Sequence, residues 1–182
     1  MTQANQLPRG WHLAGSRPSH YQASLPGAAL GQSSTLRLSA REAPTPPEGF
    51  GTVMQTFRAD SYRGRRLRFS AAVRGDDVTD WAGLWMRVDG AERGRPLGFD
   101  NMHERPVRGT GSWERHAVVL DVPTEAVRVA IGILLNGPGA VWLTDPRVEV
   151  VGPDVPVTGQ GPLPSELPEH PVNLELIPAA AG

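Results

Sequence analysis

The sequence contains no cysteine. It also contains no lysine, since all 18 of its basic residues are arginines. Without cysteine the chain cannot form disulfides, thiolate metal sites or iron–sulfur clusters. Without lysine it cannot form a Schiff base or the phosphate-binding loop that requires the amine. No apolar run reaches the ~20 residues that span a bilayer, and the start MTQANQLPRG lacks the parts of a secretory signal. We therefore expect a soluble, cytoplasmic protein with no membrane contact.

The composition is rich in turn-forming residues, with 21 glycines and 18 prolines among 182 residues. The glycines have no three-residue period and no apolar heptad persists, which excludes collagen and coiled coil. Five tryptophans need burial, which excludes wholesale disorder. The length suits one domain with a small appendage.

Apolar and polar residues alternate in short runs separated by glycine, proline, asparagine or aspartate, which is typical of strands. We predict an all-β fold, a two-sheet antiparallel β-sandwich (jelly roll) of about 8–10 strands. The predicted strands are 34–40, 51–59, 65–74, 82–89, 97–102, 114–122, 128–135, 140–143 and 147–151, with a further one near 21–25 and a single helical turn at 123–127. The predicted organisation is an N-terminal segment (1–20), a β-sandwich domain (21–151) and a proline-rich acidic tail (152–182), either extended or disordered.

Six arginines lie between Arg58 and Arg74, a density that raises the question of a nucleic-acid partner. In RRLRFSAAVR, however, Arg66, Arg68 and Arg74 alternate with apolar residues. This alternation favours the solvent-exposed face of a half-buried strand, so we predict no nucleic-acid partner. A monomer and a homodimer through an edge strand or the tail are both compatible with the sequence.

The candidate site begins in the run AGLWMRVDG. Alternation predicts that Leu84 and Met86 point into the core, whereas Trp85, Arg87 and Asp89 share the other face. A second interpretation stays open, in which Trp85 is a core residue and the apolar set lies under a loop. The next run, LGFDNMHERPVRG, is predicted to pair with this strand as a hairpin, so that the polar residues of both line one groove. An aromatic ring beside carboxylates, amides and arginines is the chemistry that holds polar, ring-shaped ligands. The predicted ligand-binding residues are Trp81, Trp85, Arg87, Phe99, Asn101, Arg105 and Trp113.

The runs GRRLRFSAAVR, WAGLWMRVDG, GSWERHAVVLDVP and AVRVAIGILLNGPGAVWLTDPRVEVV, taken in order, resemble a carbohydrate-binding-module type of jelly roll with galactose-binding-like topology. The ending VWLTDPRVEV is similar to the closing strand pair of such modules. The resemblance covers about residues 21–151 and implies an accessory ligand-binding domain of the kind found in bacterial regulators and enzymes. It also implies a structural Ca²⁺ site, for which Asp145 is the matching candidate; no other cofactor is expected.

Two functions remain open from the sequence. The first is non-catalytic binding of a small ligand, such as a saccharide, on a concave sheet face. The second is a cofactor-free cyclase or isomerase of bacterial secondary metabolism, in which a carboxyl group among aromatic rings acts as acid or base. The catalytic candidates for that reaction are Asp89, Asp100, His103 and Glu104. The histidines lack zinc-binding spacing, so no zinc site is predicted.

Overall fold

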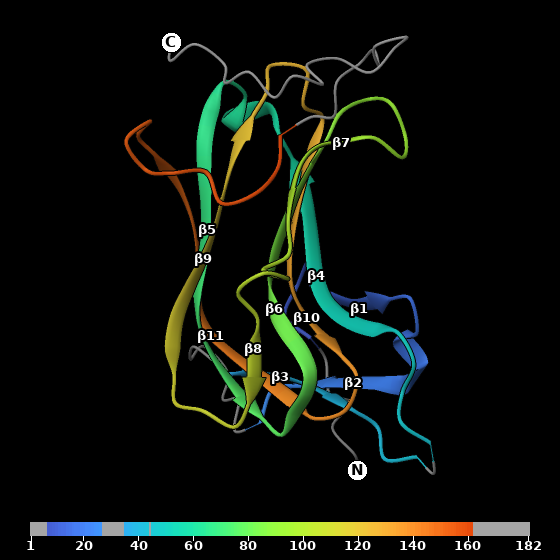
Figure 1. Ribbon diagram of the computed structural model, residues 1–182. Coiled ribbons are helices and arrows are strands. Elements are labelled where there is room, and N and C mark those ends of the chain that lie inside the picture. Colours follow the sequence, from blue (N-terminus) through green and yellow to red (C-terminus); the bar gives the residue numbers. More distant parts are fainter. Residues whose placement is uncertain (1–6, 27–34, 44, 162–182) are drawn as a thin grey trace, which may run out of the picture.

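The computed structural model describes residues 7–26, 35–43 and 45–161. Within these ranges the chain forms two antiparallel sheets that pack face to face (Figure 1). The first sheet, called sheet A, contains β1 (His12–Gly15), β4 (Phe50–Arg58), β10 (Arg128–Asn136), β6 (Val78–Asp89) and β7 (Pro96–Asp100) in that spatial order, and β8 (Val107–Gly109) also pairs with β6. The second, called sheet B, contains β2 (Tyr21–Ser24), β3 (Leu36–Ala40), β11 (Ala140–Val151), β5 (Arg65–Asp76) and β9 (Glu114–Val122). The predicted all-β sandwich is confirmed.

From β3 to β6 and again from β9 to β11, successive strands alternate between the two sheets, as in a jelly roll. The crossing from β5 to β6 needs only Asp77, which adopts a positive φ of 51°. Residues 75–81, which lie between our predicted strands, are therefore mostly the ends of two long strands that meet at Asp77. β6 accordingly begins at Val78, four residues before the predicted start at Ala82.

The core consists of the inward-facing apolar residues of both sheets. Leu84 and Met86 of β6 face Leu67 and Phe69 of β5 in one cluster, and these side chains are fully buried. The alternating arginines of β5 lie on the other side of that strand, where Arg66 pairs with Asp121 and Arg68 with Glu149 of the neighbouring strands. The prediction that these arginines lie on the outer, solvent-facing side of the strand is thus confirmed.

The predicted strands 140–143 and 147–151 are one strand, β11, interrupted by a bulge. The register shifts between Thr144 and Arg147, and Asp145 has a positive φ of 49°. Pro146 within the bulge has no N–H to donate to a ladder, which accounts for the irregularity. The expected helical turn at 123–127 is a hydrogen-bonded turn in which the Ala126 N–H donates to the Pro123 carbonyl, 3.0 Å away. The helices of the described residues are two 3₁₀ turns, η1 (Pro18–His20) and η2 (Asp60–Tyr62).

Elements outside the predicted sandwich limits of 21–151 also join the structure. β1 pairs with β4, which extends sheet A into the N-terminal segment. After β11, residues 152–161 form a strap between the edge strands β9 and β7: Thr158 exchanges hydrogen bonds with Val119, and Gln160 with Phe99. The strap covers the gap between the two sheets at this edge. The rest of the predicted tail, 162–182, lies outside the described residues.

Candidate functional site

The outer face of sheet A carries the side chains that β6 turns away from the core. Alternation directs Trp85, Arg87 and Asp89 to this face, as predicted, because the residues between them fill the core. The register sets Arg87 opposite Ala130 of β10 on one side and opposite Phe99 of β7 on the other. The predicted hairpin of β6 and β7 is confirmed, and it brings Phe99 to the same face as Arg87.

A small apolar cluster separate from the main core lies on this outer face. Trp85 packs there with Ala130 and Leu134, and Met54 and Trp81 border them. The Trp85 indole N–H donates to the Thr52 hydroxyl, 2.8 Å away. Trp85 is only 7% exposed, so its ring presents little surface to a ligand, and its role in ligand binding stays a prediction. Its ring is part of the floor of the site.

Gly132 of β10 gives this indole its space. A Cβ added at Gly132 would lie 2.7 Å from the Trp85 Nε1 atom and 2.6 Å from the Val53 carbonyl oxygen. Both distances are shorter than van der Waals contact, so a side chain at this position would displace the ring or the strand.

Asp89 is buried beside two arginines. Its carboxylate accepts a hydrogen bond from the Arg87 Nε at 3.1 Å and from the Arg128 Nε at 3.3 Å. The acid role that we considered for Asp89 requires apolar surroundings, whereas its carboxylate lies between two guanidinium groups. The geometry makes Asp89 the group that holds two arginines at the rim of the apolar cluster.

Asp100 does not share the outer face with Asp89, contrary to our expectation. It lies opposite Met86, a core residue, so alternation directs it toward the space between the sheets. There it binds the Arg105 guanidinium through both carboxylate oxygens, and it accepts hydrogen bonds from the Met102 N–H and the Thr158 hydroxyl. Asp100 therefore ties the turn after β7 to the strap.

The turn after β7 and the strap enclose a recess of about 410 Å³, called the edge recess. Of the predicted site residues it is lined by Phe99, Asp100, Asn101, His103, Glu104 and Arg105, and the strap contributes Thr158, Gly159 and Gln160. Phe99 is 40% exposed and belongs both to the recess and to the outer face. The His103 ring meets the Trp81 ring edge-on with centroids 5.1 Å apart, which joins the recess to the apolar cluster.

Sequence reasoning missed the strap residues and Arg128. The strap is more than 50 residues beyond Phe99 along the chain, and its composition indicated only a tail. Gly159 was the one local signal, because a Cβ there would lie 2.5 Å from the Phe99 carbonyl oxygen. Such a close approach of two backbones favours glycine.

Trp113 and Asp145 lie away from this site. Trp113 precedes β9 and contacts Arg74 of β5, so it belongs to sheet B and cannot join Trp81 and Phe99 around one ligand. The Asp145 carboxylate binds Arg115 and Arg147, and these arginines lower its pKa, Arg147 most of all. Two positive charges stand where a Ca²⁺ ion would need to bind, so Asp145 does not fit the expected metal site. Within the described ranges, no three His, Asp or Glu side chains gather closely enough to hold a metal ion.

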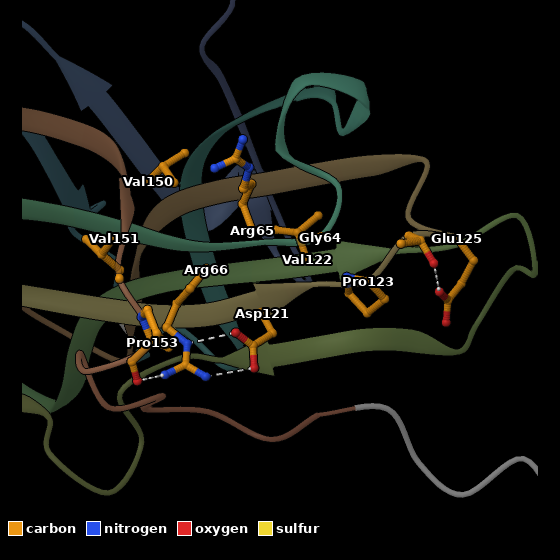
Figure 2. Close-up of a pocket in the computed structure, with 12 residues that line it drawn as sticks. Gly64, Arg65, Arg66, Asp121, Val122, Pro123, Glu125, Val150, Val151 and Pro153 are labelled. Atoms are coloured by element: carbon orange, nitrogen blue, oxygen red, sulfur yellow. Dashed lines mark hydrogen bonds and ion pairs between the residues drawn. The ribbon is translucent and has the colours of Figure 1, made fainter.

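A second recess of about 700 Å³ opens at one end of β5, β9 and β11 (Figure 2). Arg66 on its wall binds Asp121 and donates to the Pro153 carbonyl at 2.9 Å, as Figure 2 shows. It also donates to the Val155 carbonyl at 2.7 Å. These bonds fix the start of the strap, and none of the predicted site residues lines this recess. Arg66 and Asp121 therefore serve the fold here, and the edge recess, which gathers the predicted site residues, is the better candidate site.

Comparison with known proteins identifies the class of fold. No family model matches the chain. Among solved structures, it is similar to the enzymatically active domain of tailspike protein 4 of bacteriophage CBA120, with a TM-score of 0.57 and 15% identity over 79% of this chain and 20% of that one. It is also similar to the CBM22-1 xylan-binding domain of Paenibacillus barcinonensis Xyn10C, with a TM-score of 0.52 and 13% identity over 78% of this chain and 86% of that one. The chain therefore has the jelly-roll fold of carbohydrate-binding modules, as the resemblance predicted.

A curated relative adds a different context. The chain is 39% identical over 166 residues to the uncharacterized HTH-type transcriptional regulator YbfP of Bacillus subtilis (strain 168). The match covers 91% of this chain and 56% of YbfP, so the chain spans little more than half the length of this relative. None of the helices in the described part of the chain is long and apolar enough to cross a membrane.

Proposed function

We propose that the chain binds a small polar ligand of saccharide type, without catalysis, at the edge recess and the adjoining outer face of sheet A. The observation that carries the proposal is the exposed Phe99 ring, which stands between Arg87 and the polar groups of the recess. An aromatic face next to amide and guanidinium donors suits a ring with hydroxyl groups. Asn101, His103 and Gln160 supply further hydrogen-bonding groups.

The comparisons support a binding module in this role. The solved structures with this fold include a protein named as a xylan-binding domain, and one xylanase structure of Clostridium thermocellum, with a TM-score of 0.53 and 13% identity over 82% of this chain and 27% of that one, is described as complexed with xylohexaose. The relative is named a transcriptional regulator, and the described residues of this chain form a sandwich with two short 3₁₀ turns instead of a DNA-binding helix pair. We infer that the matched part of such a regulator senses a ligand.

The proposal does not extend to the cyclase or isomerase reaction. Asp89 and Asp100 each bind arginine, so neither carboxyl group stands alone among aromatic rings, as that reaction would need. His103 and Glu104 remain catalytic candidates from the sequence alone. Among the described residues, no side-chain hydrogen bond orients either of them as an acid or a base.

The test is calorimetric titration of the full chain with the saccharides that bind it on a glycan array. Phe99→Ala should weaken binding of such a saccharide about tenfold, on the order of 1.4 kcal/mol, because the stacking face is lost. Trp113→Ala is the matched control, since Trp113 is equally exposed, at 41%, but lies on sheet B. The proposal fails if no saccharide binds, or if Phe99→Ala binds as tightly as the control.

A further inference from the structure

The outer face of sheet B, opposite the proposed ligand site, carries a row of alternating arginines and tryptophans. Trp142 of β11 lies opposite Arg37 of β3 on one side and opposite Arg74 of β5 on the other. Trp113, just before β9, continues the row beyond Arg74. We call these four residues the arginine–tryptophan row. It crosses four adjacent strands, which at ~4.8 Å per strand is about 14 Å.

The arginines of the row stack on the tryptophan rings. The Arg37 Cζ lies 5.5 Å from the centre of the Trp142 ring, and the Arg74 Cζ lies 5.2 Å from Trp142 and 5.5 Å from Trp113. Stacking uses the flat face of a guanidinium group and leaves its N–H edge available for a carboxylate. The row is thus a preorganised set of two cations between two aromatic rings.

Arg37 and Arg74 differ from the other arginines of this face in having no acidic partner within the described part of the chain. Arg66, Arg68, Arg115 and Arg147 all bind Asp or Glu side chains. Among the described residues, Arg37 donates to the Ser39 hydroxyl at 2.8 Å, and no carboxylate binds Arg37 or Arg74. The Arg74 Nε and the Trp142 Nε1 are also buried without an acceptor. The row therefore has uncompensated positive charge and unused donors.

We propose that the arginine–tryptophan row binds the acidic, proline-rich sequence at residues 162–182 of this chain. That sequence contains three glutamates and five prolines, with no arginine. Carboxylates pair with guanidinium groups, and proline rings pack on tryptophan in the aromatic grooves that bind proline-rich peptides. Both components of the row therefore find a complement in the same short sequence.

The spacing of the acidic residues suits the row. Glu166 and Glu169 are three residues apart, which in a proline-rich extended helix puts them on one side at about 9 Å. The Arg37 and Arg74 Cζ atoms lie 5.5 and 5.2 Å from the centre of the Trp142 ring, so they are at most about 11 Å apart, a range that includes the spacing of the two glutamates.

The end of the described chain lies within reach of the row. Thr158 is hydrogen-bonded to Val119 of β9, and Trp113 is six residues away from Val119 along the chain, about 20 Å at ~3.3 Å per residue. The residues after Gly161 can extend to roughly 70 Å. The sequence can therefore reach the row of its own molecule or that of a second copy.

The experiment measures binding of a fluorescent synthetic peptide with the sequence of residues 162–182 by anisotropy. The receiver is the full chain carrying E166Q, E169Q and E175Q, so that its own copy of the sequence cannot compete by charge. We expect saturable binding of the peptide to this receiver. Adding either Arg74→Gln or Arg37→Gln to the receiver should weaken binding at least tenfold, and raising the salt concentration should weaken it too. Circular dichroism melting establishes that both variants are folded.

Arg65→Gln is the matched control, because Arg65 lies at the other end of β5, is exposed and has no ion pair among the described residues. It removes the same charge and should leave binding unchanged. The proposal is overturned if the peptide does not bind the receiver, if a peptide with glutamine in place of the three glutamates binds equally well, or if Arg65→Gln weakens binding as much as Arg37→Gln. None of these outcomes depends on the saccharide site of sheet A.

Discussion

At the scale of single residues, Trp85 illustrates how a side chain on an outer sheet face can still be buried. Its ring lies over Gly132, its N–H binds Thr52, and the apolar neighbours on β4 and β10 cover it. Trp85→Ala should therefore lower the free energy of unfolding by about 3 kcal/mol, the loss typical of a buried aromatic ring. Urea denaturation measures this change.

Trp113→Ala, at an exposed ring, should cost less than 1 kcal/mol in the same assay. If the two variants lose equal stability, the burial of Trp85 does not contribute to folding as we describe.

His116 is the residue at which pH should act on stability. Burial lowers the pKa of His116 below its ordinary value, nearby Arg105 also lowers it, and Glu114 acts in the opposite sense. The unfolded chain therefore binds a proton at a higher pH than the folded one, and stability is lost as the pH falls from about 6.5 toward the folded pKa.

His116→Gln, which cannot be protonated, should have a smaller decrease in unfolding free energy between pH 7 and pH 5 than the parent chain. Denaturation curves at both pH values measure the difference. Equal pH dependence in the two proteins would exclude His116 as its source, and His12→Gln, at an exposed position, serves as the control.

At the scale of elements, the strap shows how a segment without regular structure completes the sandwich. The Thr158 hydroxyl donates to the buried Asp100 carboxylate and accepts from the buried Val119 N–H at 2.7 Å. Thr158→Val keeps the shape, leaves the Val119 N–H without this acceptor and removes one of the hydrogen bonds to Asp100, which should cost roughly 1–3 kcal/mol. It should also increase hydrogen exchange at residues 152–161.

Thr124→Val is the control for this change, because the Thr124 hydroxyl is exposed and bonds only to the neighbouring Glu125. Unfolding and hydrogen-exchange measurements on both variants decide the matter. Unaltered exchange of the strap in Thr158→Val would mean that the hydroxyl does not anchor it.

The hairpin of β6 and β7 accounts for both the success and the failure of the site prediction. Alternation along β6 was enough to assign Trp85 and Asp89 to one face. The same rule assigns neighbouring residues of β7 to opposite faces, so Phe99 and Asp100 cannot both line the outer groove. The register between β6 and β7 decides whether Phe99 or Asp100 faces the outer groove. The sequence does not specify this register.

At the scale of the whole molecule, the two sheets separate two surfaces with different chemistry. The outer face of sheet A has an apolar cluster and an edge recess, whereas the outer face of sheet B has paired arginines and the arginine–tryptophan row. We propose a saccharide-type ligand for the first surface and an acidic segment for the second. Because the core lies between them, each proposal can be tested without disturbing the other.

The sequence by itself determined the fold class, most of the strands and the face on which each side chain of β6 lies. These follow from local alternation and from the turn residues between the runs, which require no knowledge of distant partners. Only the tertiary structure decided which residues share a site. Strand register turned Asp100 toward the strap, sheet membership separated Trp113 from Phe99, and packing over Gly132 buried Trp85. Each of these depends on contacts between segments far apart in the chain, and a local pattern carries no information about them.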